Sequence, residues 1–223
     1  VADTRNYRIR KLSQPGLFFT YTVGSGHASG DLDYSSTSAL ALNGGTINDA
    51  AGNGAILTLA SPGATNSLGA NKALVIDTTA PTVASVSSTT ADGTKKAGDS
   101  VAVTVTFSES VTVTGTPQLT LETGSSDAVV DYTSGSGGAT LTFTYTVVSG
   151  HTNADLDYAS SSALALNGGT IKDAAGNEAI LTLAMPGAMN SLGANTELVI
   201  DTTSPTVTHV TSLNEEFSYH VVG

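Results

Sequence analysis

The chain has 223 residues, with eight Lys and Arg against 19 Asp and Glu, so its net charge is −11 and a basic nucleic-acid-binding surface is excluded. It contains no cysteine, which excludes disulfides, thiolate metal sites and a cysteine nucleophile, and no apolar run reaches the length of a membrane span. Only 12% of the residues are charged and small residues dominate, a composition typical of β-structure with many turns.

The first predicted element lies in a non-repeat arm, residues 1–16, which holds four of the eight basic side chains. Tyr7, Arg8, Ile9 and Arg10 alternate apolar and basic residues, which predicts a strand with a basic face. The alternative is a solvated, poorly ordered terminus. Because the chain begins with Val1 rather than Met, we expect it to be processed or to be part of a longer protein.

An internal repeat follows the arm. Residues 17–83 align without gaps with residues 141–207, and 53 of the 67 positions are identical. An offset of 124 residues suits tandem duplication of one small β-domain rather than a solenoid unit. The segment Asp-Thr-Thr-x-Pro marks the boundary, because proline interrupts strand pairing. We therefore expect a partial repeat over 17–79, a complete repeat over 80–203, and the first strand of a further repeat with a divergent tail over 204–223.

Alternation of apolar and polar residues predicts eight strands in the complete repeat. They cover residues 82–86, 101–107, 118–122, 129–132, 141–148, 164–171, 180–183 and 198–200. Turns rich in Gly, Pro and Asn separate them, and no stretch has a helical period. The predicted fold class is all-β: tandem immunoglobulin-like Greek-key β-sandwiches, of which the first is incomplete.

The complete repeat contains a series of turn-rich motifs: AGDS (97–100), VTFSE (105–109), VTGTP (113–117), LNGGTIKDAAGN (166–177) and IDTTSP (200–205). This series resembles the bacterial immunoglobulin-like repeats of large surface proteins and adhesins, including those of the repeats-in-toxin type. The resemblance covers nearly all of residues 17–212. It implies a non-enzymatic, extracellular stalk or scaffold, often made rigid by calcium between domains.

Acidic residues near the predicted turns are candidate calcium ligands, because Ca²⁺ takes six to eight oxygen ligands. We expect Asp77, Glu109, Asp173 and Asn177 to converge where the linker enters the complete repeat. The remaining candidates are Asp201, Asp49, Asn53, Asp155, Asp157, Asp31 and Asp33. The alternative for each residue is that it stabilises a turn by bonding nearby backbone N–H groups.

The two ends suggest a second interpretation. The partial repeat lacks the counterparts of residues 80–140, and an isolated partial sandwich exposes core residues and strand edges. A strand from a neighbour would complete it by β-augmentation. The candidate self-association residues are Tyr7, Arg8, Ile9 and Arg10 in the arm, and Thr206, Val207, Thr208, His209 and Val210 near the C-terminus.

Three functions follow. The first is a structural repeat of an extracellular bacterial surface protein or adhesin stalk, with calcium as the candidate ion that makes it rigid and with same-type domains as neighbours. The second is a self-assembling filament subunit joined head to tail by strand complementation. The third is a carbohydrate- or protein-binding module, disfavoured because the chain has no Trp. We expect no enzyme, since no Gly-x-Ser-x-Gly motif or spaced acid pair is present.

Overall fold

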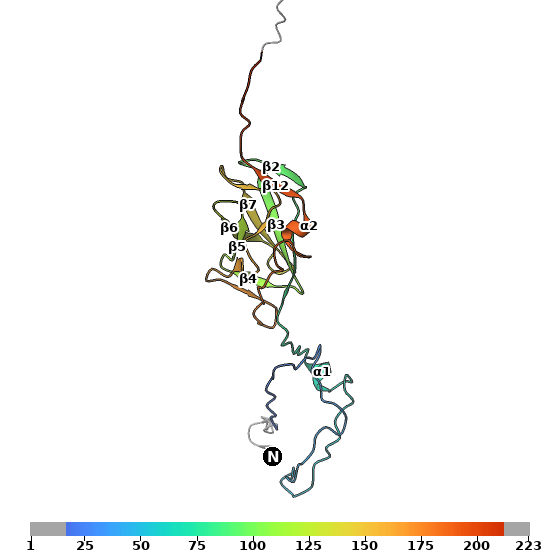
Figure 1. Cartoon of the computed structure of the whole chain (residues 1–223). Coiled ribbons are helices and arrows are strands. Elements are labelled where there is room, and N and C mark those ends of the chain that lie inside the picture. Colours follow the sequence, from blue (N-terminus) through green and yellow to red (C-terminus); the bar gives the residue numbers. More distant parts are fainter. Residues whose placement is uncertain (1–16, 212–223) are drawn as a thin grey trace, which may run out of the picture. The chain divides into compact units, whose positions relative to one another are not determined.

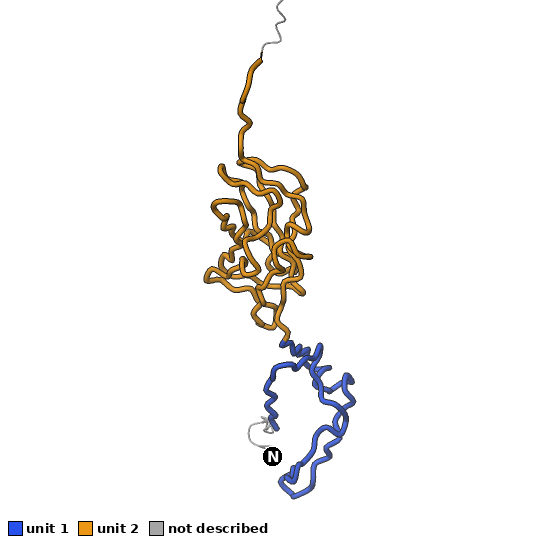
Figure 2. Tube along the Cα trace, viewed as in Figure 1, with its two compact units in different colours: residues 1–78 blue, residues 79–223 orange. Residues whose placement is uncertain are grey.

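The computed structural model describes residues 17–211, and their contacts divide the chain into two units (Figure 2). Unit 1 ends at Thr78 and unit 2 begins at Thr79. The basic strand predicted at Tyr7, Arg8, Ile9 and Arg10 lies outside the described residues and stays a prediction. No helix in residues 17–211 has both the length and the apolar character needed to cross a membrane.

Unit 2 contains all twelve described strands and one short helix (Figure 1). The strands are β1 (Val83–Ser88), β2 (Gly93–Lys95), β3 (Ser100–Phe107), β4 (Thr112–Thr114), β5 (Gln118–Glu122), β6 (Ala128–Ser134), β7 (Thr140–Thr146), β8 (Thr152–Asn153), β9 (Asp157–Tyr158), β10 (Leu164–Ala165), β11 (Thr170–Lys172) and β12 (Leu198–Asp201). The helix of unit 2 is α2 (Leu192–Asn195), and unit 1 contains its counterpart α1 (Leu68–Asn71).

The largest sheet has the order β1-β3-β7-β6-β5-β10, with β9 also paired to β5. Strand β6 links its two halves, because its first residues pair with β5 while Tyr132 and Ser134 pair with β7 across a bulge. Two smaller sheets, β11-β4 and β2-β12-β8, complete the unit, and only the β2–β12 pair is parallel. Because β6 changes partners at a bulge, the sheet bends there and its two halves can pack over one core.

The core of unit 2 follows directly from the alternation in the sequence. Every second residue of β3 is buried, from Val101 to Phe107, and β7 buries Leu141, Phe143 and Tyr145 in the same way. Phe143 packs against the edge of Tyr132, with ring centroids 6.1 Å apart. The predicted all-β sandwich is therefore confirmed for this unit.

Two predicted strands of unit 2 are wrong in detail. The strand predicted over 164–171 is interrupted by a turn, in which Asn167 and Gly168 have φ of 47° and 76° and Gly169 N donates to Leu166 O. This left-handed backbone cannot continue a strand. The strand predicted over 180–183 forms only one isolated bridge, from Ile180 to Thr82.

Unit 1 repeats the loops of unit 2 without its strands. Its described residues form the isolated bridges Ser29–Ile76 and Asn48–Gly54 and the helical turn α1. Both helical turns were missed by the sequence analysis, because four residues are too short to show a helical period. Ser67 and Ser191 nevertheless carry the signal, since each caps its helix by accepting a hydrogen bond from a backbone N–H three residues on.

Candidate metal centre

Three carboxylates meet at the start of the complete repeat, and we call Asp77, Glu109 and Asp173 the entry cluster. One oxygen of each lies within 4.8 Å of the others. Asp77 is in the segment that leads into β1, Glu109 is in the turn between β3 and β4, and Asp173 follows β11. Asp77, Glu109 and Asp173 are three of the four residues predicted to converge, with Asn177, and their carboxylates lie together in the structure.

A tight turn presents the carboxylate of Asp173 to the cluster. Asn177 donates its backbone N–H to one carboxylate oxygen at 2.8 Å and its side-chain amide to the other at 2.7 Å. The same amide donates to Thr79 O at 3.3 Å. Partial desolvation raises the pKa of Asp173, but the hydrogen bonds from Asn177, Gly176 and Ala175 outweigh it, so the pKa lies below its ordinary value. Asp173 is therefore ionised at neutral pH.

The electrostatics of the entry cluster favour a cation. Two unit charges less than 5 Å apart near a protein surface repel by roughly 3–4 kcal/mol. A divalent ion among three carboxylates offsets this repulsion. Asp77, Glu109 and Asp173 offer hard oxygen ligands, and Ca²⁺ takes the rest of its six to eight oxygens from carbonyl groups and water. The donor set thus fits Ca²⁺.

The pair Asp155 and Asp157 organises a loop of unit 2. The carboxylate of Asp157 accepts the backbone N–H groups of Tyr158 at 2.9 Å and Gly187 at 2.8 Å. Both aspartates face Gly193 in α2, where an added Cβ would lie 3.0 Å from Asp157 Oδ2 and 3.2 Å from Asp155 Oδ2. A Cβ at this point would press on both carboxylates, which would have to move by a few tenths of an ångström.

The equivalent pair in unit 1, Asp31 and Asp33, has equivalent hydrogen-bond partners and faces the equivalent glycine. Asp33 accepts the backbone N–H of Gly63 at 3.0 Å, and both carboxylates face Gly69. Desolvation raises the pKa of Asp33, but hydrogen bonds led by that of Gly63, with Ser67 among the others, lower it to about 2. The hydrogen bonds of both pairs match the turn-stabilising alternative for these residues.

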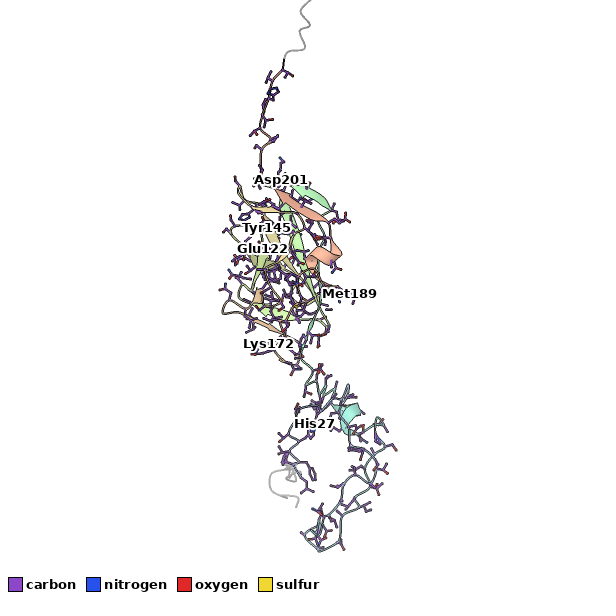
Figure 3. The ribbon with its side chains drawn as sticks, in the orientation of Figure 1. His27, Glu122, Tyr145, Lys172, Met189 and Asp201 are labelled. Atoms are coloured by element: carbon purple, nitrogen blue, oxygen red, sulfur yellow. The ribbon has the colours of Figure 1, made fainter. Side chains whose placement is uncertain are left out.

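The remaining candidates lie apart from a third carboxylate. Asp49 accepts the backbone and side-chain N–H groups of Asn53, each at 2.8 Å, as Asp173 does from Asn177. Asp201 accepts the backbone N–H of Thr203 at 2.8 Å. Asp201 and Lys172, the neighbour of Asp173, lie at opposite ends of unit 2 (Figure 3). Within residues 17–211, the entry cluster is the one set of three acidic or histidine side chains close enough to share an ion.

The glycines that face the paired aspartates, Gly69 and Gly193, were not predicted as part of a site. A signal was present, because the segment Leu-Gly-Ala-Asn is identical in both copies, at 68–71 and 192–195. A glycine inside a helix otherwise lowers the stability of the helix by about 1 kcal/mol relative to alanine. The close approach of the carboxylates explains why glycine is used here twice.

Residues 77–186 match the family model of the bacterial Ig-like domain. The match begins at Asp77 and contains the whole entry cluster, and it supports a bacterial Ig-like domain in this part of the chain. Such domains are typically structural, extracellular modules of surface proteins, and the family is not enzymatic. Neither the curated proteins nor the solved structures contain a match to this chain.

Proposed function

We propose that this chain is a structural repeat of an extracellular bacterial surface protein, of the kind found in adhesin stalks, and that it binds calcium at the entry cluster. The observation that carries the proposal is the position of the three carboxylates in an Ig-like domain, at the segment through which the chain enters it. Other residues do not supply a comparable trio within the described chain. The resemblance to adhesin repeats supports the surface role.

In this proposal the ion fixes the entering segment to the body of the domain. Asp77 belongs to the segment, whereas Glu109 and Asp173 belong to turns of the sandwich. Without the ion, the carboxylates repel and loosen the segment. With it, the segment is held by metal bonds in addition to the hydrogen bond from Ile180 N to Pro81 O at 2.8 Å. A stalk needs this stiffness to keep its distal domains away from the cell.

Thermal unfolding of the full chain tests the calcium site. An ion that binds only the folded state, at a free concentration of 100 times its Kd, adds about 2.7 kcal/mol to the free energy of unfolding. We expect the Tm of unit 2 to rise by roughly 10 °C in calcium relative to a chelator. Asp77→Asn removes one ligand and should abolish most of this rise, and calorimetric titration should show the loss of one binding site.

Asp201→Asn is the matched control, because Asp201 occupies the same position in the repeat as Asp77 but has no third carboxylate near it among the described residues. This variant should keep the full calcium response. Equal melting curves with and without calcium in the unmodified chain contradict the site. The surface role is tested separately, by antibody labelling and protease shaving of intact cells, and an inaccessible protein contradicts it.

A further inference from the structure

Unit 1 and the segment after β12 are two unmatched pieces of the same sandwich. Unit 1 contains the counterparts of residues 141–202. Residues 205–210 are the counterparts of residues 81–86, of which the first two precede β1 and the last four belong to it. In the described structure, residues 17–78 form none of the strands of their counterparts in unit 2, and residues 205–210 form no strand.

Unit 2 shows how this first strand binds the second half of a sandwich. Besides its pairing with β3, it is held by contacts with two loops. Ile180 N donates to Pro81 O at 2.8 Å, and Thr82 forms a parallel bridge with Ile180. Val86 N donates to Asn190 O at 2.9 Å.

The short helix α2 supplies the rest of this attachment. Asn195 donates its side-chain amide to Val86 O at 2.7 Å, and α2 packs against β1. Leu192 of α2 is fully buried in the same core as Val86. The groups that hold the first strand, in Ile180, Asn190, Leu192 and Asn195, all belong to the half repeat that unit 1 also contains.

Unit 1 holds the same docking groups in the same local geometry. Ile56, Asn66, Leu68 and Asn71 are identical to Ile180, Asn190, Leu192 and Asn195 at the constant offset. The backbone of Asn66 has φ of 74°, against 73° for its counterpart, and the capped turn of α1 reproduces that of α2. Ile56 is 91% exposed. The site is therefore formed and accessible before any strand occupies it.

The donor segment is equally exposed. Residues 202–211 form no strand in the described structure, and Val207 and Val210 are each 84% exposed. Their counterparts in β1 are Val83, which is partly buried, and Val86, which is fully buried. Next to the docking groups of unit 1 lies an apolar hollow, lined by Phe19, Tyr34, Leu40, Leu59 and Leu68, which gives the two valines an apolar surface to cover.

We propose that residues 205–210 of one copy bind unit 1 of a second copy as β1 binds unit 2. In this register Pro205 O accepts from Ile56 N, Val210 N donates to Asn66 O, and the side chain of Asn71 donates to Val210 O. The donor segment and the acceptor are different surfaces of residues 17–211, so the contact is heterologous and can repeat head to tail. It goes beyond the structural function above and does not depend on calcium.

Mixed single-cysteine variants test both the contact and its register, because the chain has no cysteine of its own. Thr82 and Ile180 are bridge partners, and paired strands lie about 4.8 Å apart, within the Cα range of a disulfide. Ile56→Cys is mixed with a tagged Thr206→Cys chain under mild oxidation in chelator. We expect a disulfide dimer that contains one chain of each kind.

The register control is Thr208→Cys, which moves the thiol two residues along the donor and should give at most a tenth of the dimer. No mixed dimer, or an equal yield from Thr208→Cys, overturns the proposal. Because the cysteines are on different chains, an intrachain contact cannot give the expected product. Ile56 and Thr206 are both exposed, so neither substitution removes a core side chain.

Light scattering at several concentrations gives an independent test. The molar mass of the unmodified chain should rise with concentration above 22.3 kDa. Val210→Asp places a charge where the proposal buries a methyl-rich side chain, and the mass should stay that of one chain. Thr208→Asp is the matched control, because its counterpart Ala84 is exposed in β1, and it should associate as the unmodified chain does. A constant mass for the unmodified chain, or association of Val210→Asp, contradicts the proposal.

Discussion

Units 1 and 2 present nearly the same residues in two environments. Phe143 is fully buried and Tyr145 is 2% exposed, whereas their counterparts Phe19 and Tyr21 are 75% and 52% exposed. Strand β7, which carries the buried pair, is hydrogen-bonded to β3 and β6. Residues 17–78, the described part of unit 1, contain no counterpart of either partner strand, and residues 17–22 form no strand. Strand formation in this repeat therefore requires the other half of the sandwich.

The loops behave in the opposite way. Tyr34 donates its hydroxyl to Ala60 O at 2.7 Å, and Tyr158 donates to Ala184 O at the same distance. The caps of α1 and α2 and the aspartate-centred turns are also common to both units. These hydrogen bonds join residues within one half repeat. A half repeat therefore forms its loops by itself, whereas its strands form only with a partner.

The largest expected effect comes from truncating the same aromatic side chain in each unit. Phe143→Ala should lower the free energy of unfolding of unit 2 by about 3–5 kcal/mol, because it leaves a cavity in a closed core. Phe19→Ala should change stability by less than about 0.5 kcal/mol, as at other exposed sites. Urea unfolding of the full chain, followed by tyrosine fluorescence, measures both. A comparable loss from Phe19→Ala would mean that unit 1 has a covered core.

A second matched pair tests the packing of β4 against β11. A Cβ at Gly169 would lie 2.2 Å from Thr114 O, whereas one at Gly45 would meet only Leu42 O, at 3.2 Å. Gly169→Ala should therefore force the two strands apart and cost about 1–3 kcal/mol. Gly45→Ala should leave unfolding nearly unchanged, because no strand lies opposite it among the described residues of unit 1. Denaturation midpoints that shift equally in both variants would contradict this assignment.

The all-β sandwich was predictable because its core strands alternate in the sequence. Strands β3 and β5 have the period of two that a half-buried strand requires, and the structure places them within a residue of the predicted bounds. Strands β8 and β9 were missed, since two residues carry no period. The strand predicted over 164–171 also ran across the gap between β10 and β11. Asn167 fits the polar position of an alternating strand, and only its positive φ shows that the strand stops there.

The entry cluster was predictable for a different reason. Its residues fall in turns at fixed places in a repeat, and the topology of an Ig-like domain brings those turns to one end. The roles of Asp33 and Asp157 could not be read in the same way, because the backbone N–H groups that they accept, from Gly63 and Gly187, lie 30 residues away in the chain. Such contacts become visible only when the loop is folded.

A smaller effect is expected at the hairpin after β11, where the two units differ in sequence. Lys172 forms an ion pair with Glu178 at 3.3 Å, with side chains 37% and 75% exposed. Unit 1 has Asn48 and Gly54 instead, and the backbone bridge forms in both units. Lys172→Gln should therefore lower stability by at most about 1 kcal/mol, and 1 M salt should remove the difference. A larger, salt-independent loss in urea unfolding would show that the hairpin depends on the ion pair.

The smallest expected effect is a shift in one titration, and it tests whether the loops of unit 1 hold without a closed core. Hydrogen bonds from the loop lower the pKa of Asp33 to about 2, against 3.8 for a free aspartate. Because the folded pKa is depressed, the stabilisation of the loop is present above pH 3.8 and is lost as the pH falls through about 2. Carboxyl ¹³C NMR of the full chain measures this pKa directly. Gly63→Pro removes the backbone donor that bonds Asp33, so the pKa should move back toward 3.8. An unmodified chain in which Asp33 already titrates near 3.8 would mean that the half repeat needs its missing strands even to keep its loops.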